Sequence, residues 1–561
     1  MSAKVRVLPL GGLGEIGKNM TVVECDDRIM LVDVGLMFPT SDMHGIDLVL
    51  PDFEYLRDRA DRIDAIFLTH GHEDHVGALP FLLRELGMPP VILGGPLTIG
   101  LVRSKLEEHK LRDAPLEVIE AGETRTAGPF ELEAIRMSHS IPNTLAVAIG
   151  TPLGKLLFTG DYKFDQTPVD GGPADMARLS ELGVAGEILC LCGDSTNADR
   201  NGVAPSESSV GPALLELFAR CEGRIIVTCF ASNVHRVQQV VDAAAALDRR
   251  VALVGRSMRK NFNIASNLGI ANAPDGLLIP PREIEDFPDH KVIAISTGSQ
   301  GEPLSALRRM AHGDHRDIEL RRDDTVIFSA TPIPGNEKAV GETIDKIYEL
   351  GARVVTAAEA PIHASGHGWR EELKLMLNLT RPQHVMPMHG DHRRLRLHAD
   401  LAEAVGIDPE RIFCSRNGRP VEFTADGAEF GADVRAGMIF VDGMGIGDID
   451  EVALRDRRAL AGDGVLIIVA TIAEEDGSEV SPPEVVFRGV PFVSGGESEA
   501  DGTGTLVEEL QELVSESLAR AARDGIREVD LLGEDIRDDV AGLIHKRLRR
   551  RPMVLPVVVE V

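Results

Sequence analysis

The sequence contains few aromatic residues and no long apolar run. Tryptophan occurs once and tyrosine three times in 561 residues, which argues against base recognition on a broad aromatic platform. No run of apolar residues approaches the roughly 18 that a membrane-spanning helix requires. The first residues lack the charged and apolar regions of a signal peptide. We therefore expect no membrane partner and a cytoplasmic location.

Basic residues and cysteine pairs are also scarce. The formal net charge is −30, which by itself argues against nucleic acid as a partner, because polyanion binders usually carry a basic footprint. A metal centre with a local basic groove can still bind phosphate inside an acidic envelope. The six cysteines form no CxxC pair and mostly lie in apolar runs, so we interpret them as buried reduced thiols.

The chain is organised around the stretch Thr69–His75. Three histidines and an aspartate fall within six residues, directly after the apolar run Ala65–Leu68. Histidines at positions i and i+2 of an extended chain point the same way, and Asp74 and His75 follow on the turn. Imidazole nitrogens with a carboxylate oxygen suit zinc or another first-row metal. The alternative, a polar loop that happens to carry histidines, does not explain the ligands found elsewhere.

Other apolar strand-like runs also end in a histidine or an aspartate. Such strand ends place ligands on one rim of a rigid sheet, and strand pairs covered by helices predict an αββα sandwich. The residues found at such strand ends are His139, Asp161, Asp194 and His389, of which Asp194 belongs to neither metal-ligand set.

These residues divide into two sets of metal ligands that share one carboxylate. His70, His72, His139 and Asp161 make the first set, and Asp74, His75, Asp161 and His389 make the second. Asp161 would then bridge two divalent ions about 3.5–4 Å apart, which together lower the pKa of a water between them. Zinc suits this ligand set best, and manganese or magnesium stays open. Any single ligand could instead be a polar residue satisfied in the core.

Strict alternation of strands and helices after residue 205 predicts a second domain with a parallel sheet. The expected organisation is a first part of the sandwich domain at 1–205, an inserted α/β domain at 206–355, and the second part of the sandwich at 356–445. A linker and a small C-terminal α/β domain occupy 446–561. A flexible loop is expected at 494–504.

The stretch Gly12–Gly17 matches the G-x-G-x-x-G pattern of dinucleotide-binding folds. That function requires a helix directly after the glycines. Strand-like runs at 19–24 and 28–33 follow instead, which indicates a meander. We interpret the glycines as a turn near the metal site.

The motifs together resemble a known family. Thr69–His75 resembles the signature of the metallo-β-lactamase superfamily, and Asp33, His139, Asp161 and His389 resemble its other motifs. Asp194, His367 and the inserted domain resemble the β-CASP nuclease branch. Four further stretches resemble bacterial ribonuclease J, and the likeness covers nearly the whole chain: Gly11–Asn19, Phe230–Arg236, Thr297–Glu302 and Pro387–Asp391.

The resemblance implies a metal-dependent ribonuclease of RNA processing and decay, including rRNA processing and mRNA decay. It implies hydrolysis of phosphodiesters in single-stranded RNA by a hydroxide activated by two metal ions, leaving 5′-phosphate and 3′-hydroxyl ends. Activity would be 5′→3′ exonucleolytic on 5′-monophosphate RNA, with endonucleolytic cuts as well. Asp74 would act at the metal centre, and Asp194 and His367 would assist proton transfer to the leaving oxygen. The C-terminal domain would support a homodimer or tetramer, and RNA-decay proteins are expected partners.

Two segments are expected to bind the 5′-phosphate. Short side-chain donors, exposed backbone N–H groups and the start of a helix favour an anion. The candidate residues are Ser232, Asn233 and His235 and, in a second segment, His363, Ala364, Ser365, Gly366 and His367. Ser232 could equally be a plain helix cap. The basic stretches Arg256–Asn261 and His392–Arg396 are candidates for the RNA entry channel.

Three alternatives stay open. A DNA nuclease of the same branch is the nearest, and by resemblance His389 favours RNA over DNA. A small-molecule hydrolase acting on a lactone, thioester or β-lactam needs neither His367 nor an insertion of roughly 150 residues, the size of a whole domain. A non-catalytic RNA-binding protein would not need a complete ligand set.

Overall fold

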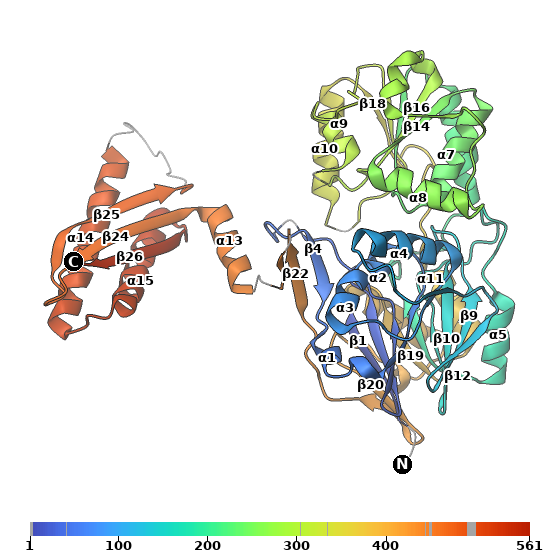
Figure 1. The fold of residues 1–561 in the computed structure, drawn as a ribbon, viewed down its shortest axis with the longest axis horizontal. Coiled ribbons are helices and arrows are strands. Elements are labelled where there is room, and N and C mark those ends of the chain that lie inside the picture. Colours follow the sequence, from blue (N-terminus) through green and yellow to red (C-terminus); the bar gives the residue numbers. More distant parts are fainter. Residues whose placement is uncertain are drawn as a thin grey trace. The chain divides into compact units, whose positions relative to one another are not determined.

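The computed structural model describes residues 4–40, 42–302, 304–333, 335–443, 445–447, 451–490 and 501–561 (Figure 1). The chain forms two compact units. One comprises Met1–Phe38 and Leu48–Ile439, and the other comprises Pro39–Asp47 and Phe440–Val561.

The first sheet of the larger unit opens with a meander, in which β1 pairs antiparallel with β2 and β2 with β3. Strand β2, and not a helix, follows the glycine-rich turn after β1, so the predicted meander is confirmed. The strand order is β21-β20-β1-β2-β3-β5-β6-β7. In chain order the strands are β1 (Val5–Gly11), β2 (Met20–Cys25), β3 (Arg28–Val32), β5 (Ile63–Leu68), β6 (Ile92–Gly94), β7 (Leu116–Val118), β20 (Val421–Thr424) and β21 (Gly427–Phe430).

The second sheet joins parts of the chain that are far apart in sequence. Its last strand, β19, pairs parallel with β12, so that Asp194 lies opposite Met388 and next to His389. The order is β19-β12-β11-β10-β9-β8. The strands are β8 (Thr124–Ala127), β9 (Phe130–Arg136), β10 (Leu145–Thr151), β11 (Gly154–Phe158), β12 (Ile188–Asp194) and β19 (His384–Met388).

The two sheets pack face to face. Val7 and Phe67 of the first sheet share a buried cluster with Val147 and Phe158 of the second. Helices cover the outer face of the second sheet through a separate cluster, and the predicted αββα sandwich is confirmed. The helices of this domain are α1 (Glu54–Arg57), α2 (Glu73–Val76), α3 (Leu79–Leu86), α4 (Pro96–Glu108), α5 (Met176–Ala185), α11 (Arg370–Thr380) and α12 (His392–Ala404), and the short β4 (Leu48–Pro51) precedes α1.

The inserted domain has a parallel sheet with helices on both faces, as the alternation of elements predicts. Its strand order is β15-β14-β16-β13-β17-β18. The strands are β13 (Ile225–Thr228), β14 (Arg250–Val254), β15 (Leu278–Ile279), β16 (Val292–Ser296), β17 (Thr325–Phe328) and β18 (Arg353–Val355). The helices are α6 (Val210–Ala219), α7 (Val234–Ala246), α8 (Arg256–Asn267), α9 (Ala306–Ala311) and α10 (Glu337–Glu349).

Helix α8 is an element that the sequence analysis missed. Its first residues were interpreted only as a basic stretch. Met258, Phe262 and Ala265 are buried on one side of α8, and their spacing of four and three residues is the period of a helix. Because the mean hydropathy of α8 is low, the helical spacing of its few apolar residues was not recognised in the sequence.

The smaller unit ends in a three-stranded sheet covered on one face by two long helices. The sheet order is β25-β24-β26, and α14 and α15 cover it through one buried cluster. Its elements are β22 (Met438–Asp442), β23 (Gly445–Ile446), α13 (Glu451–Asp463), β24 (Val465–Ile472), β25 (Glu479–Arg488), α14 (Asp501–Asp524), α15 (Val529–Leu548) and β26 (Met553–Glu560). The sequence analysis missed β25.

The loop expected at 494–504 lies largely outside the described residues, which resume at α14. Because α14 begins at Asp501, residues 501–504 are helical, and the expectation of a loop there is wrong. Among the described helices, none combines the length and hydropathy that a membrane span needs. The cytoplasmic location stays a prediction.

Removing a buried side chain from α5 will destabilise the sandwich domain. Leu182 is fully buried against the second sheet, whereas Val184 on the same helix is 71% exposed. We expect Leu182→Ala to cost about 2–5 kcal/mol and Val184→Ala to change stability by less than about 0.5 kcal/mol. Urea titration followed by circular dichroism measures both. Equal shifts of the unfolding midpoint would contradict this packing.

Candidate metal centre

Seven side chains from four segments meet at one edge of the sandwich. Each segment leaves a buried strand just before its functional residue, so the sheets hold the residues in place. The residues are His70, His72, Asp74 and His75 after β5, His139 after β9, Asp161 after β11 and His389 after β19.

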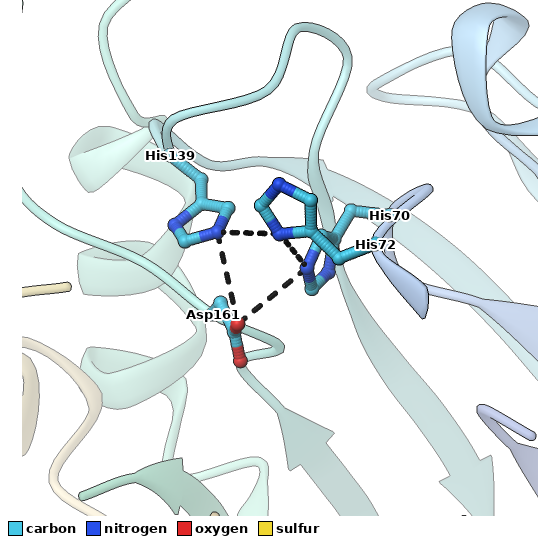
Figure 2. A group of neighbouring side chains, drawn as sticks. All are labelled: His70, His72, His139 and Asp161. Atoms are coloured by element: carbon cyan, nitrogen blue, oxygen red, sulfur yellow. Dashed lines mark hydrogen bonds and ion pairs between the residues drawn. The ribbon is translucent and has the colours of Figure 1, made fainter. Parts of the chain in front are cut away.

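The first ligand set is compact (Figure 2). His72 Nδ1 lies 3.0 Å from His70 Nε2 and 3.2 Å from His139 Nε2. Asp161 Oδ2 lies 3.5 Å from His70 Nε2 and 3.7 Å from His139 Nε2. With metal–ligand bonds of about 2.0–2.2 Å, ligands around a tetrahedral ion lie roughly 3.3–3.6 Å apart. The spacing therefore fits one ion.

The second set uses the other oxygen of the same carboxylate. Asp161 Oδ1 lies 3.2 Å from His75 Nε2 and 2.8 Å from His389 Nδ1. Asp74 Oδ2 lies 3.6 Å from His75 Nε2 and 3.4 Å from His389 Nε2. The buried His389 Nε2 has no hydrogen-bond partner among the described residues. Such an orphaned nitrogen and the donor chemistry of the set fit a second cation.

Burial sets the protonation of the first set. Burial lowers the pKa of His70 and His139 well below the usual value and that of His72 to about 4. These imidazoles are neutral at pH 7 and offer a lone pair, as metal binding requires.

The second set carries protons in the metal-free protein. Burial lowers the pKa of His389, but the carboxylates of Asp161 and Asp74 outweigh burial and raise this pKa to about 10. The same carboxylates raise the pKa of His75. Burial would raise the pKa of Asp161, yet His389 and His75 hold it well below its usual value. A cation at this set must therefore displace protons.

Neighbouring side chains orient the ligands. Asp33, whose φ of 60° lies in the left-handed region, accepts hydrogen bonds from Thr69 N at 2.8 Å, and its carboxylate lies 2.7 Å from His75 Nδ1. Asn19 Nδ2 donates to the Asp74 carbonyl at 3.1 Å. Such contacts fix the tautomer and direction of metal ligands. The sequence analysis did not single out Asn19, although it closes the glycine-rich motif.

The glycine-rich turn supports the other side of the centre. Gly14 N donates to the Gly390 carbonyl, directly after His389. A Cβ on Gly14, where φ is +78°, would lie 2.7 Å from the His392 ring. The turn therefore needs glycine because the His389–His392 segment packs against its backbone.

A histidine–aspartate pair lies beside the metal ligands. His367 Nδ1 lies 2.7 Å from Asp194 Oδ2, and Thr196 N and Oγ1 donate to Asp194 Oδ1. Burial lowers the pKa of His367, but Asp194 and Asp161 outweigh it and raise the pKa above its usual value. His367 Nε2 lies 3.8 Å from Asp161 Oδ2, so the imidazole faces the centre and its raised pKa favours the charged form.

Family models match four consecutive stretches of the chain. They are the metallo-beta-lactamase superfamily at 13–206, the ribonuclease J beta-CASP domain at 222–347, the Zn-dependent metallo-hydrolase RNA specificity domain at 353–412, and the ribonuclease J C-terminal domain at 452–561.

Relatives match over almost the whole length. Ribonuclease J of Mycolicibacterium smegmatis is 44% identical over 99% of this chain and 97% of its own length. Ribonuclease J of Thermus thermophilus is 42% identical over 99% of this chain and 95% of its own length, and ribonuclease J2 of Bacillus subtilis is 39% identical over 99% of each. This chain belongs to the ribonuclease J family.

Membership of the ribonuclease J family confirms the resemblance drawn from the motifs and assigns the His/Asp cluster to divalent metal ions. A crystal structure of a protein of unknown function from Enterococcus faecalis V583 matches with a TM-score of 0.53 at 15% identity. It covers 75% of this chain and 100% of that chain, and the likeness shows the fold alone.

One of the two predicted phosphate-binding segments is the loop that carries His367. Asn197 Nδ2 donates to Ser365 Oγ at 2.8 Å and to the His367 carbonyl at 3.2 Å. The Gly366 carbonyl lies 2.7 Å from His139 Nδ1, and a Cβ on Gly366 would come within 2.6 Å of that ring. Gly366 thus orients a metal ligand.

The other predicted segment precedes α7. Asn233 caps this helix by accepting from Arg236 N at 3.0 Å, directly after Ser232. His235 Nε2 lies 3.7 Å from Asp170 Oδ2, and its ring lines a small cavity with Ser138. The ring nitrogens of His235 have no hydrogen-bond partner in the part of the chain described.

Metal uptake at pH 7 will release protons. Because the pKa values of His75 and His389 are raised, both are protonated before metal binds, and each must lose a proton to offer a lone pair. Calorimetric titration in two buffers of different ionisation enthalpy should give roughly two protons released per chain. His389→Ala should release fewer. A binding enthalpy that does not depend on the buffer would contradict this assignment.

Proposed function

We propose that this protein, a metal-dependent ribonuclease by family, hydrolyses RNA phosphodiesters at a centre that holds two divalent ions. It removes nucleotides in the 5′→3′ direction from RNA with a 5′-monophosphate and also cuts internally, in RNA processing and decay. One observation carries the proposal: the two oxygens of Asp161 face two separate ligand sets, with the Asp194–His367 pair beside them.

The ligands divide between the ions as the distances indicate. His70, His72 and His139 would hold one ion, Asp74, His75 and His389 would hold the other, and Asp161 would serve both sets. When bound, two such ions supply an activated water near neutral pH and neutralise charge on a phosphoryl group. Imidazole and carboxylate ligands suit zinc best and accept manganese.

His367 supplies the proton for the leaving group. In hydrolysis, a new P–O bond forms with the oxygen of water while the P–O3′ bond breaks. The leaving 3′-oxygen needs a proton, which the charged imidazole gives from Nε2, while Asp194 holds Nδ1 at 2.7 Å. The products carry a 5′-phosphate and a 3′-hydroxyl.

The 5′-phosphate is bound between the start of α7 and the His363–Gly366 segment. Ser365 Oγ accepts hydrogen bonds from Asn197 Nδ2 and His367 N, so its own O–H is left to donate to a phosphate oxygen. His363 Nδ1 is buried without a hydrogen-bond partner among the described residues. The N-terminus of α7, a helix of 13 residues, favours an anion beside Ser232.

Local basic residues support RNA binding along the backbone. Arg256 and Arg259 of α8 are exposed and form no ion pair with any described residue. In contrast, Lys260 pairs with Glu108, and Arg393 with Asp199. The free pair on α8 is therefore the better candidate for contacts with phosphates, and binding there should weaken with salt.

The C-terminal domain supports assembly into a homodimer or tetramer. Its sheet has helices on one face only. The other face carries partly or fully exposed aliphatic residues of β24 and β26: Val465, Ile467, Val469, Leu555, Val557 and Val559. Packing two such faces together removes this apolar surface from water. RNA-decay proteins remain expected partners.

A cleavage assay tests the reaction and separates the roles of two residues. We expect cleavage of 5′-monophosphate RNA with zinc or manganese, and no cleavage of DNA of the same sequence or of a lactone or thioester. His367→Ala should lower kcat about 10²–10⁴-fold with normal metal content. Asp74→Ala should lose metal, as atomic absorption measures. The exposed His312→Ala serves as a control. Full activity of His367→Ala would show that His367 is not the proton donor. Cleavage of DNA or of a lactone, with no cleavage of RNA, would overturn the proposed ribonuclease activity.

A charge on the open face of the C-terminal sheet tests the assembly. Val557 on that face and Leu531 on the helical side are each 45% exposed. We expect Val557→Lys to reduce the mass measured by light scattering to that of a single chain, because an unpaired charge in an apolar interface is costly. Leu531→Lys should leave the mass unchanged. An unaltered assembly in Val557→Lys would show that another surface joins the chains.

A further inference from the structure

Arg236 is the largest fully buried side chain of the described residues, with no exposed surface. It lies in the first turn of α7, three residues after Asn233. A buried guanidinium must place five N–H groups on acceptors, or the cost of taking the charge out of water is not offset.

Each nitrogen of the Arg236 guanidinium donates to an acceptor. Nε and Nη2 donate to the two carboxylate oxygens of Glu207 at 2.9 Å each, a bidentate pair. Nη1 donates to the Ser329 carbonyl at 2.8 Å, to Ser329 Oγ at 2.6 Å and to the Ile362 carbonyl at 2.9 Å. Because its side chain is fully buried among these acceptors, Arg236 does not reach a substrate.

The partners come from three separate parts of the fold. Glu207 begins the short turn before α6, Ser329 follows β17, and Ile362 stands directly before His363. They are 29, 93 and 126 residues from Arg236 in sequence. Ser329 Oγ also donates to the Ile362 carbonyl at 2.6 Å, which closes the network.

The network therefore joins the two segments on either side of the 5′-phosphate. At one end, the backbone N–H of Arg236 holds the Asn233 cap, directly after Ser232. At the other end, the Arg236 side chain donates to the Ile362 carbonyl. Ile362 directly precedes the segment His363–Ser365. A well-packed apolar side chain often stabilises a core as well as a buried ion pair does. An apolar residue, however, could not hold the start of α7 and the His363–Ser365 segment together by directed hydrogen bonds.

The environment of His363 agrees with this arrangement. Burial and the nearby charge of Arg236 lower the pKa of His363 to about 3. The ring is neutral at pH 7, and its Nδ1 is left without a protein partner in the described structure. A neutral ring with a free nitrogen is ready to exchange a hydrogen bond with a ligand.

We propose that Arg236, held by Glu207, is a positioning residue that aligns Ser232 with the His363–Ser365 segment so that both contact one 5′-phosphate. The inference rests on the proposed binding of 5′-monophosphate RNA. Arg236 itself does not touch the substrate.

The test compares variants on three RNA substrates: linear RNA with a 5′-monophosphate, the same RNA with a 5′-hydroxyl, and a circular RNA, which reports internal cleavage alone. Lysine keeps the charge of Arg236 but cannot reach three partners at once. We expect Arg236→Lys to raise KM for 5′-monophosphate RNA about 10–100-fold. The preference over 5′-hydroxyl RNA should fall by the same factor, while kcat on circular RNA stays at the wild-type value.

Arg224→Lys is the matched control. Arg224 is also buried in the inserted domain, where it pairs with Asp324 at 2.7 Å, but it precedes β13, whereas Ser232 follows that strand. The control should change thermal stability without changing the preference for the 5′-end. Glu207→Gln, which removes the charge and keeps the volume, should reproduce the effect of Arg236→Lys and carries the test if that variant does not fold.

The outcomes separate the two proposals. If the wild-type enzyme shows no preference for 5′-monophosphate, the phosphate site is wrong and the role of Arg236 with it. If the wild type shows the preference and both Arg236→Lys and Glu207→Gln retain it, the phosphate site stands and the positioning role is overturned. Equal loss of activity on all three RNAs would mean that the network only stabilises the fold.

Discussion

The carboxylate of Asp161 is the constraint on which the rest of the centre depends. It is a buried charge, and a buried charge persists only with opposite charge close by. In the metal-free protein, protonated His75 and His389 supply that charge. Since each of its oxygens faces a different ligand set, two cations can take over this role. In the proposed two-ion centre, the position of Asp161 would define where both ions bind.

Residues that precede the inserted domain in the chain and residues that follow it both come to lie near Asp161. Asp194 ends β12 before the insertion, and His367 and His389 come after it. Parallel pairing of β12 with β19 closes this gap of almost 200 residues, because Asp194 lies opposite Met388. The His367 loop is held from the other direction by Asn197. The inserted domain can therefore carry the proposed phosphate-binding groups while the chain returns to the Asp194–His367 pair.

Local patterns in the sequence were sufficient to predict the residues that cluster as candidate metal ligands. Thr69–His75 places its four ligands through strand and turn geometry alone, and the other three ligands follow apolar strands. The αββα sandwich and the parallel sheet followed from the order of strands and helices. Helix α8 and strand β25 were missed, because low hydropathy concealed the period of α8 and half of β25 is exposed.

The sequence by itself determined which residues are candidate metal ligands, which family they indicate and which elements alternate, since these properties reside in short spacings. Only the tertiary structure decided what depends on distant partners. The division of the Asp161 oxygens between two sets is one example, and the alignment of His139 by the Gly366 carbonyl is another. Arg236 is the clearest case. In the sequence it is one of many arginines, and its role appears only when Glu207, Ser329 and Ile362 are brought around it by packing.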